Sequence, residues 1–87
     1  MKSFKFTVKD PQGLHARPAT EIAKSANKYT STVELDVIGN KFNAKSVLNI
    51  MSAGIKNNTE IQIICNGEDE EEALDGIVQT FKENSLV

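Results

Sequence analysis

The fold depends most on the stretch EIQIIC, residues 60–65, because its position in the sheet decides the order of the other strands. The pattern predicts a strand, and Asn66-Gly67 directly after it is a turn signal. Three further strands are expected, at residues 2–8, 32–38 and 41–43. In a split βαβ arrangement the last strand inserts between the first and the second. We therefore expect residues 60–65 at the centre of the sheet.

The strand patterns predict a sheet with one buried and one solvated face. In residues 2–8, phenylalanine and valine alternate with polar side chains, and residues 32–38 show a similar alternation. Gln62 and Ile64 then fall on the solvated face, so Ile64 is expected to be exposed. Gly39-Asn40 fits a two-residue hairpin turn with glycine first.

Two helices are expected before the last strand. The first has Pro18 in its first turn, where backbone N–H groups lack intrahelical partners anyway, and it ends near Asn27. Its apolar stripe contains Ala19, Ile22, Ala23 and Ala26. The second covers residues 46–51, with Ser46 as N-cap and Gly54 as the C-terminal stop.

The third helix runs from Asp69 to about Glu83, with a continuous apolar stripe along one side. Asp69 and Glu72 resemble a capping box, and acidic residues suit the start of a helix. The resulting order, β-α-β-β-α-β-α, predicts an α+β fold with helices covering one face of the sheet. Residues 1–87 are expected to form a single domain.

Composition narrows the classes of function. The chain has 87 residues, a formal net charge of −2, 39% hydrophobic residues and one cysteine, Cys65. The charge argues against a nucleic-acid binder, and no apolar run is long enough for membrane insertion or a signal peptide. One cysteine permits neither an intramolecular disulfide nor a cysteine metal cluster. These features predict a cytoplasmic protein.

The segment GLHARPA, residues 13–19, is the strongest functional signal. It holds the only histidine and the only arginine of the chain, His15 and Arg17. At a helix start, the N–H groups of Ala16 and Arg17 would attract an anion, and the guanidinium suits phosphate. A neutral imidazole is a nucleophile, so this arrangement favours attack by His15 on a phosphoryl group and storage of the product.

Simpler interpretations of His15 also exist. A lone surface histidine is usually just solvated. One histidine without clustered cysteine or carboxylate partners is not a metal-ligand set, and no second acid or base nearby supports a hydrolase. A generic small binding module therefore remains an alternative.

The motif at residues 13–19 resembles the phosphorylation-site signature of HPr, the histidine-containing phosphocarrier family of the bacterial sugar phosphotransferase system. The likeness continues at residues 27–29, at residues 45–51, which resemble the family's regulatory segment, and at residues 67–73, where the last helix starts. This resemblance implies an open-faced β-sandwich with four antiparallel strands and three helices.

The resemblance also implies a function. His15 would accept a phosphoryl group on Nδ1 from Enzyme I, which phosphoenolpyruvate phosphorylates, and would pass it to IIA domains of sugar permeases. Arg17 would stabilise the phosphate. The protein would need no cofactor or metal and would be a carrier rather than an enzyme. We expect a monomer, because a carrier must expose its site to successive partners.

Ser46 matches a second family site, which a kinase/phosphorylase modifies in some bacteria, with a catabolite control transcription factor as a further partner. A phosphate there would add about −1.5 to −2 charge beside a docking patch of Val47, Leu48 and Met51, with Thr20. Alternatively, Ser46 is only an N-cap and the apolar residues are core. A regulatory paralogue acting through Ser46 alone is a further alternative, but such proteins lack the histidine.

Three positions depart from the family pattern. Gln12 replaces a small hydroxyl residue, Leu48 stands where methionine is common, and Asn49 stands where many members have glycine. None of them affects the phosphoryl chemistry, and each could tune the preference for partners.

Overall fold

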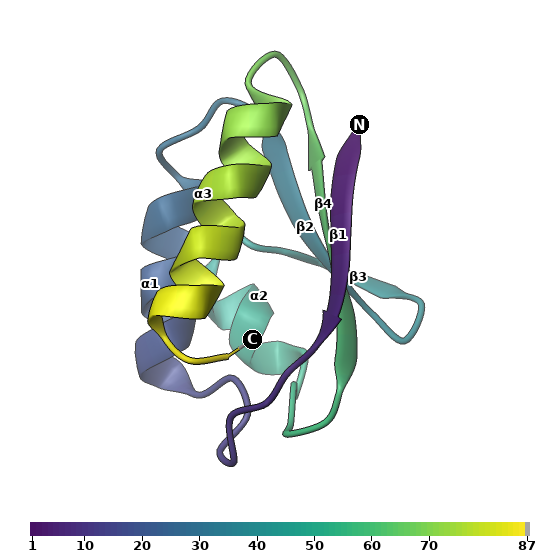
Figure 1. Ribbon diagram of the computed structural model, residues 1–87, viewed down its shortest axis with the longest axis vertical. Helices are drawn as coiled ribbons and strands as arrows, with labels where there is room; N and C mark the ends of the chain where they lie inside the picture. The colour runs from purple at the N-terminus through teal and green to yellow at the C-terminus, as the bar shows by residue number, and fades with distance from the viewer. Residues whose placement is uncertain (87) are drawn as a thin grey trace.

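The computed structural model describes residues 1–86 and contains seven elements in the expected order (Figure 1). They are β1 (Lys2–Thr7), α1 (Ala16–Ala26), β2 (Thr32–Val37), β3 (Asn40–Asn43), α2 (Val47–Ser52), β4 (Glu60–Asn66) and α3 (Glu70–Glu83). The strands form one antiparallel sheet in the order β1-β4-β2-β3. The predicted insertion of the last strand between the first and the second is therefore confirmed.

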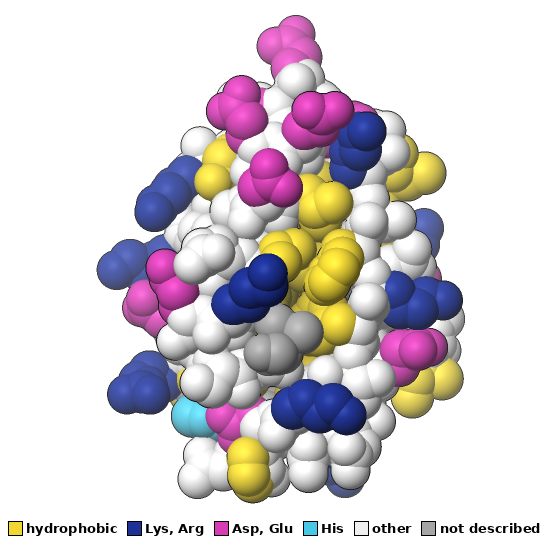
Figure 2. Space-filling view, viewed as in Figure 1, with side chains coloured by type: hydrophobic (Ala, Val, Ile, Leu, Met, Phe, Trp, Pro, Cys, Tyr) yellow, Lys and Arg dark blue, Asp and Glu magenta, His cyan; other side chains and the backbone are white. Residues whose placement is uncertain are grey.

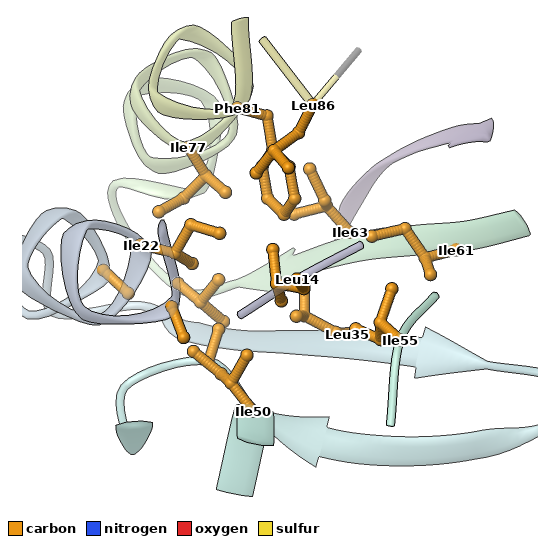
Figure 3. Packing of buried hydrophobic residues seen from close by; sticks show 14 of the residues in the cluster. Leu14, Ile22, Leu35, Ile50, Ile55, Ile61, Ile63, Ile77, Phe81 and Leu86 are labelled. Carbon is orange, nitrogen blue, oxygen red and sulfur yellow. The ribbon is translucent and has the colours of Figure 1, made fainter. Parts of the chain in front are cut away.

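The three helices cover one face of the sheet and leave the other face open, so the α+β open-faced prediction is confirmed (Figure 1). On the covered face Ile63 of β4 lies opposite Phe4 of β1 and Leu35 of β2. Figure 3 shows Ile63 and Leu35 together with side chains from all three helices, namely Ile22, Ile50, Ile77 and Phe81. The core sits between the sheet and the helices, and each large side chain buried there contributes roughly 1.5–3 kcal/mol.

Ile64 differs from the expectation. It lies on the open face, opposite Ser3 and Glu34, and it does not belong to the main core cluster. Its side chain is nevertheless only 9% exposed, so the prediction of an exposed isoleucine is wrong. The reason is that β4 is a central strand, so side chains of both neighbouring strands flank it.

The β2–β3 hairpin is displaced by one residue from the predicted turn. Val37 pairs with Asn40, so the two central residues are Ile38 and Gly39 rather than Gly39 and Asn40. Both have positive φ, 50° and 85°, as in a type I′ turn. A β-branched residue rarely adopts that conformation, which is why the sequence pattern favoured the other placement.

The start of α3 does not contain the expected capping box. The Asp69 side chain makes no capping hydrogen bond to its own helix. It instead accepts hydrogen bonds from the N–H groups of Thr30 and Ser31, at 3.0 and 2.9 Å, and from the Ser31 hydroxyl. Asp69 therefore ties the start of α3 to the loop before β2.

Candidate functional site

Gly13, in the loop before α1, packs tightly against a second loop and so helps to position His15. Gly13 has a φ of +67°, and a Cβ atom there would lie 2.6 Å from the Cα of Lys56 and would also clash with the Ile55 carbonyl. The next residue, Leu14, is buried, and its N–H donates to the Ile55 carbonyl at 2.9 Å. This close contact between the two loops fixes where His15 leaves the core.

His15 is the N-cap residue of α1. Its backbone is extended, with φ −93° and ψ −174°, and its carbonyl accepts from the N–H of Ala19 at 3.0 Å. The side chain is half-buried and does not cap the helix. The imidazole therefore stands at the helix mouth without being used in capping.

The first turn of α1 exposes two backbone donors. Ala16 and Arg17 are its first two residues, and Pro18, the third, has no N–H. Within residues 1–86 neither amide donates to another backbone group. Because the turn contains no acidic residue and the Arg17 side chain is exposed, the mouth of α1 is suited to an anion.

The predicted residues of the second helix lie on α2, which packs against α1. Ser46 is its N-cap, and the Ser46 Oγ accepts from the N–H of Asn49 at 3.2 Å, as the capping prediction requires. Leu48 is 83% exposed and Met51 41% exposed. Val47 is half-buried against the core, so it belongs only partly to an exposed patch.

Thr20 lies one turn into α1 on an exposed position. Its hydroxyl donates to the Ala16 carbonyl at 2.8 Å, which places it on the same part of the helix as the two open amides. With α2 packed beside α1, the surface around His15 combines open N–H groups, one guanidinium and apolar side chains.

Two other kinds of reactive site could supply chemistry, a metal site and a cysteine nucleophile. Among residues 1–86, no group of three or more His, Cys, Asp or Glu side chains could hold a metal ion. Burial, together with the negative charges of Glu70 and Asp69, raises the pKa of the Cys65 thiol to about 11, so Cys65 is a poor nucleophile at neutral pH.

In the part of the chain that the structure describes, no helix has both the length and the apolar character needed to cross a membrane.

Sequence reasoning missed one group of polar residues near Ser46. Asn43, at the end of β3, accepts at its carbonyl from Ser46 N–H and at its Oδ1 from Lys45 N–H. Its own N–H donates to the Oδ1 of Asn49 on α2. The only signal in the sequence is that asparagine often bonds to nearby backbone, which predicts neither the partner nor the direction.

Comparison with known proteins gives a consistent result. Residues 2–83 match the model of the PTS HPr component phosphorylation site. The chain is 46% identical to phosphocarrier protein HPr of Mycoplasma pneumoniae, over the full length of both. A solved histidine-containing phosphocarrier protein of Mycoplasma has a TM-score of 0.97 and 37% identity, covering 99% of this chain and 98% of its own.

The fold is also shared with Crh, the catabolite repression protein of Bacillus subtilis. That structure, described as an intertwined dimer with a swapped domain, has a TM-score of 0.75 and 39% identity, covering 100% of this chain and 99% of its own. Full-length matches in sequence and structure, together with a histidine at the N-cap of α1, lead to one assignment. The chain belongs to the HPr family, the phosphocarrier proteins of the sugar-transporting phosphotransferase system.

Proposed function

We propose that His15 accepts a phosphoryl group from phosphorylated Enzyme I in the cytoplasm and passes it to IIA domains of sugar permeases. The observation that carries this proposal is the N-cap position of His15, beside the open N–H groups of Ala16 and Arg17. A histidine there can both attack phosphorus and retain the charged product. In this role residues 1–87 act as one monomeric domain and as a carrier rather than an enzyme.

The transfer needs only one bond exchange. The Nδ1 of neutral His15 attacks phosphorus, and a new N–P bond forms as the bond between phosphorus and the donor breaks, its electron pair remaining on the donor. The phosphoryl oxygens then accept from the amides of Ala16 and Arg17, and the guanidinium adds positive charge. Transfer to a IIA domain reverses these steps, with the partner's nucleophile attacking phosphorus.

The patch of Val47, Leu48 and Met51, with Thr20, supports docking of these partners. Leu48 and Met51 are large apolar side chains on an exposed helix beside α1, where apolar exposure is otherwise costly. An apolar contact at this place would hold a partner's phosphorylated residue over the mouth of α1.

Ser46 is the proposed regulatory site. Its side chain is half-buried at the start of α2, one residue before the docking patch. A phosphate added by a kinase/phosphorylase would place about −1.5 to −2 charge there and disfavour apolar or acidic partners. The likeness to Crh supports a second role in catabolite regulation, through a transcription factor that binds the Ser46-phosphorylated form.

The direct test is incubation with phosphoenolpyruvate and a heterologous Enzyme I, followed by intact mass measurement. We expect one phosphoryl group that is lost in acid and survives base, and its absence in His15→Ala. Ser46→Ala is the matched control and should still gain the group. Failure of the wild type to gain it, with Enzyme I active on another HPr, would contradict the proposal.

A further inference from the structure

We propose that Asn49 is a positioning residue that fixes the rotation of α2 and so determines how Leu48 and Met51 are presented to partners. This inference rests on the proposed docking role of α2. It concerns a residue that has no place in the phosphoryl chemistry itself.

Packing alone holds α2 weakly. The helix has only six residues, and Ile50 is its one fully buried side chain, with Val47 half-buried against the same core. Figure 3 shows Ile50 directed toward the same core as Ile22 of α1. A helix this short is marginal in isolation, and one buried side chain with a half-buried neighbour fixes the rotation of the helix about its own axis only weakly.

The Asn49 side chain supplies a second attachment, to the sheet. Its Oδ1 accepts from the N–H of Asn43 at 3.2 Å. Asn43 ends β3, an edge strand that pairs only with β2. The bond therefore joins α2 to the edge of the sheet through a side chain rather than through the connecting loop.

The positions of the α2 residues around the helix axis explain how Asn49 controls which side chains face outward. An α-helix turns by about 100° per residue, so Asn49 and Met51 lie on opposite flanks of Ile50. Leu48 is roughly 160° from Ile50, on the outer side. Ile50 is held in the core and Asn49 at the sheet edge. Met51 then lies on the remaining flank, 41% exposed, and Leu48 on the outer side, 83% exposed.

The same residue also holds the proposed regulatory serine. The Asn49 N–H donates to Ser46 Oγ at 3.2 Å, and the Ser46 N–H donates to the Asn43 carbonyl at 3.2 Å. Ser52 completes the network, because its hydroxyl donates to the Asn49 carbonyl at 2.7 Å. Ser46, Asn49 and Asn43 thus form one connected unit, in which Asn49 is the member on the helix.

Substitution can separate this role from helix stability. Asn49→Ala removes the attachment while improving intrinsic helix propensity, so a merely structural account predicts no loss. Asn49→Asp keeps an acceptor oxygen, and assays at high salt screen its added charge. Asn40→Ala, at the opposite end of β3 from Asn43, is a matched control for loss of an asparagine side chain.

The experiment measures transfer from Enzyme I to each variant as a function of its concentration. We expect Asn49→Ala to raise the KM about three- to tenfold with kcat unchanged, since loss of one hydrogen bond lowers the population of the competent orientation by about that factor. Asn49→Asp should restore most of the KM, and Asn40→Ala should match the wild type.

Two further measurements make the outcome decisive. Leu48→Ala tests the docking patch itself: if it leaves the KM unchanged, the docking proposal fails and the inference fails with it. If Leu48→Ala raises the KM and Asn49→Ala does not, only the positioning role is overturned. Hydrogen exchange of the Asn43 amide in the wild type needs no variant, and a fully unprotected amide would also overturn it.

Discussion

Two helices of this protein begin in opposite ways. The first turn of α1 has no acidic residue, and among residues 1–86 the amides of Ala16 and Arg17 donate to no backbone group. The first turn of α3 contains three glutamates, residues 70–72, and Asp and Glu side chains gather at this end of the molecule (Figure 2). One helix mouth is thus suited to an incoming anion, whereas the other is surrounded by the chain's own carboxylates.

The carboxylates at α3 serve the fold. The Glu70 side chain accepts from the N-terminal ammonium of Met1 at 2.7 Å and from the Gly67 N–H at 3.1 Å, which lowers the pKa of Glu70. Asp69 binds the loop before β2. The two helix starts thus differ in whether the chain's own carboxylates occupy the N-terminal end of the helix, and only α1 keeps that end clear of them.

The largest expected effect comes from making α1 resemble α3. Arg17→Glu removes the guanidinium and adds a carboxylate beside His15, so it should lower kcat/KM for phosphoryl transfer roughly 100-fold, the effect of losing a charged hydrogen bond. Arg17→Lys, which keeps the charge and loses the planar fork, should cost only a few-fold. Steady-state transfer from Enzyme I measures both.

A matched change at the other helix sharpens the test. Glu71→Arg reverses a charge in the first turn of α3 and should leave the rate within about twofold of the wild type, because exposed charges far from the site are screened. An equal loss of rate from both substitutions would mean that overall charge, and not the mouth of α1, controls transfer.

The second prediction concerns the loop that positions His15. Gly13→Ala forces alanine into a left-handed conformation and against the backbone of Ile55 and Lys56, so we expect a loss of roughly 3 kcal/mol in the free energy of unfolding. Gly54 has a similar φ, +61°, but nothing within 4 Å of its Cβ position. Gly54→Ala should therefore cost only about 1–2 kcal/mol, the strain alone. Urea unfolding compares them, and equal losses would show that the loop contact is unimportant.

The third and smallest prediction concerns pH at the α3 corner. Hydrogen bonds from the Ser31 hydroxyl and the Thr30 N–H lower the pKa of Asp69 from 3.8 to about 2. A lowered folded-state pKa contributes stability that is fully present above 3.8 and is lost as the pH falls through about 2. Asp69→Asn should lower the melting temperature at neutral pH, and the difference from wild type should vanish below pH 2.

Asp75→Asn, on an exposed position of the same helix, is the control and should show a much smaller difference at neutral pH. A gap between wild type and Asp69→Asn that stays constant from pH 7 to pH 1.5 would contradict the assigned role of the Asp69 carboxylate.

Much of the fold was predictable because it depends on local patterns. Alternation identified the strands, and the apolar stripe with Ala19, Ile22, Ala23 and Ala26 identified a helix whose side is buried as expected. The capping role of Ser46 was predictable for the same reason, since an N-cap serine acts on its own first turn.

The shifted β2–β3 turn is a local error, caused by Ile38 adopting a positive φ, but the other errors arose where distant partners decide the outcome. The Asp69 side chain does not cap its own helix, because it accepts three hydrogen bonds from Thr30 and Ser31, the latter 38 residues away in sequence. Ile64 is buried by neighbouring strands, and Asn49 bonds to Asn43 across two elements. In each case the residue type allows several partners, and only the folded chain selects one.

In the proposed function, the mouth of α1 receives the phosphoryl group. The most direct measurement is a ¹H–¹⁵N spectrum of the protein before and after phosphorylation by phosphoenolpyruvate and Enzyme I. We expect ¹⁵N–³¹P coupling at Nδ1 of His15 and the largest amide shifts at Ala16 and Arg17. Phosphorus coupled to another residue, or amide shifts at Glu70 to Glu72 as large as those at Ala16 and Arg17, would contradict it.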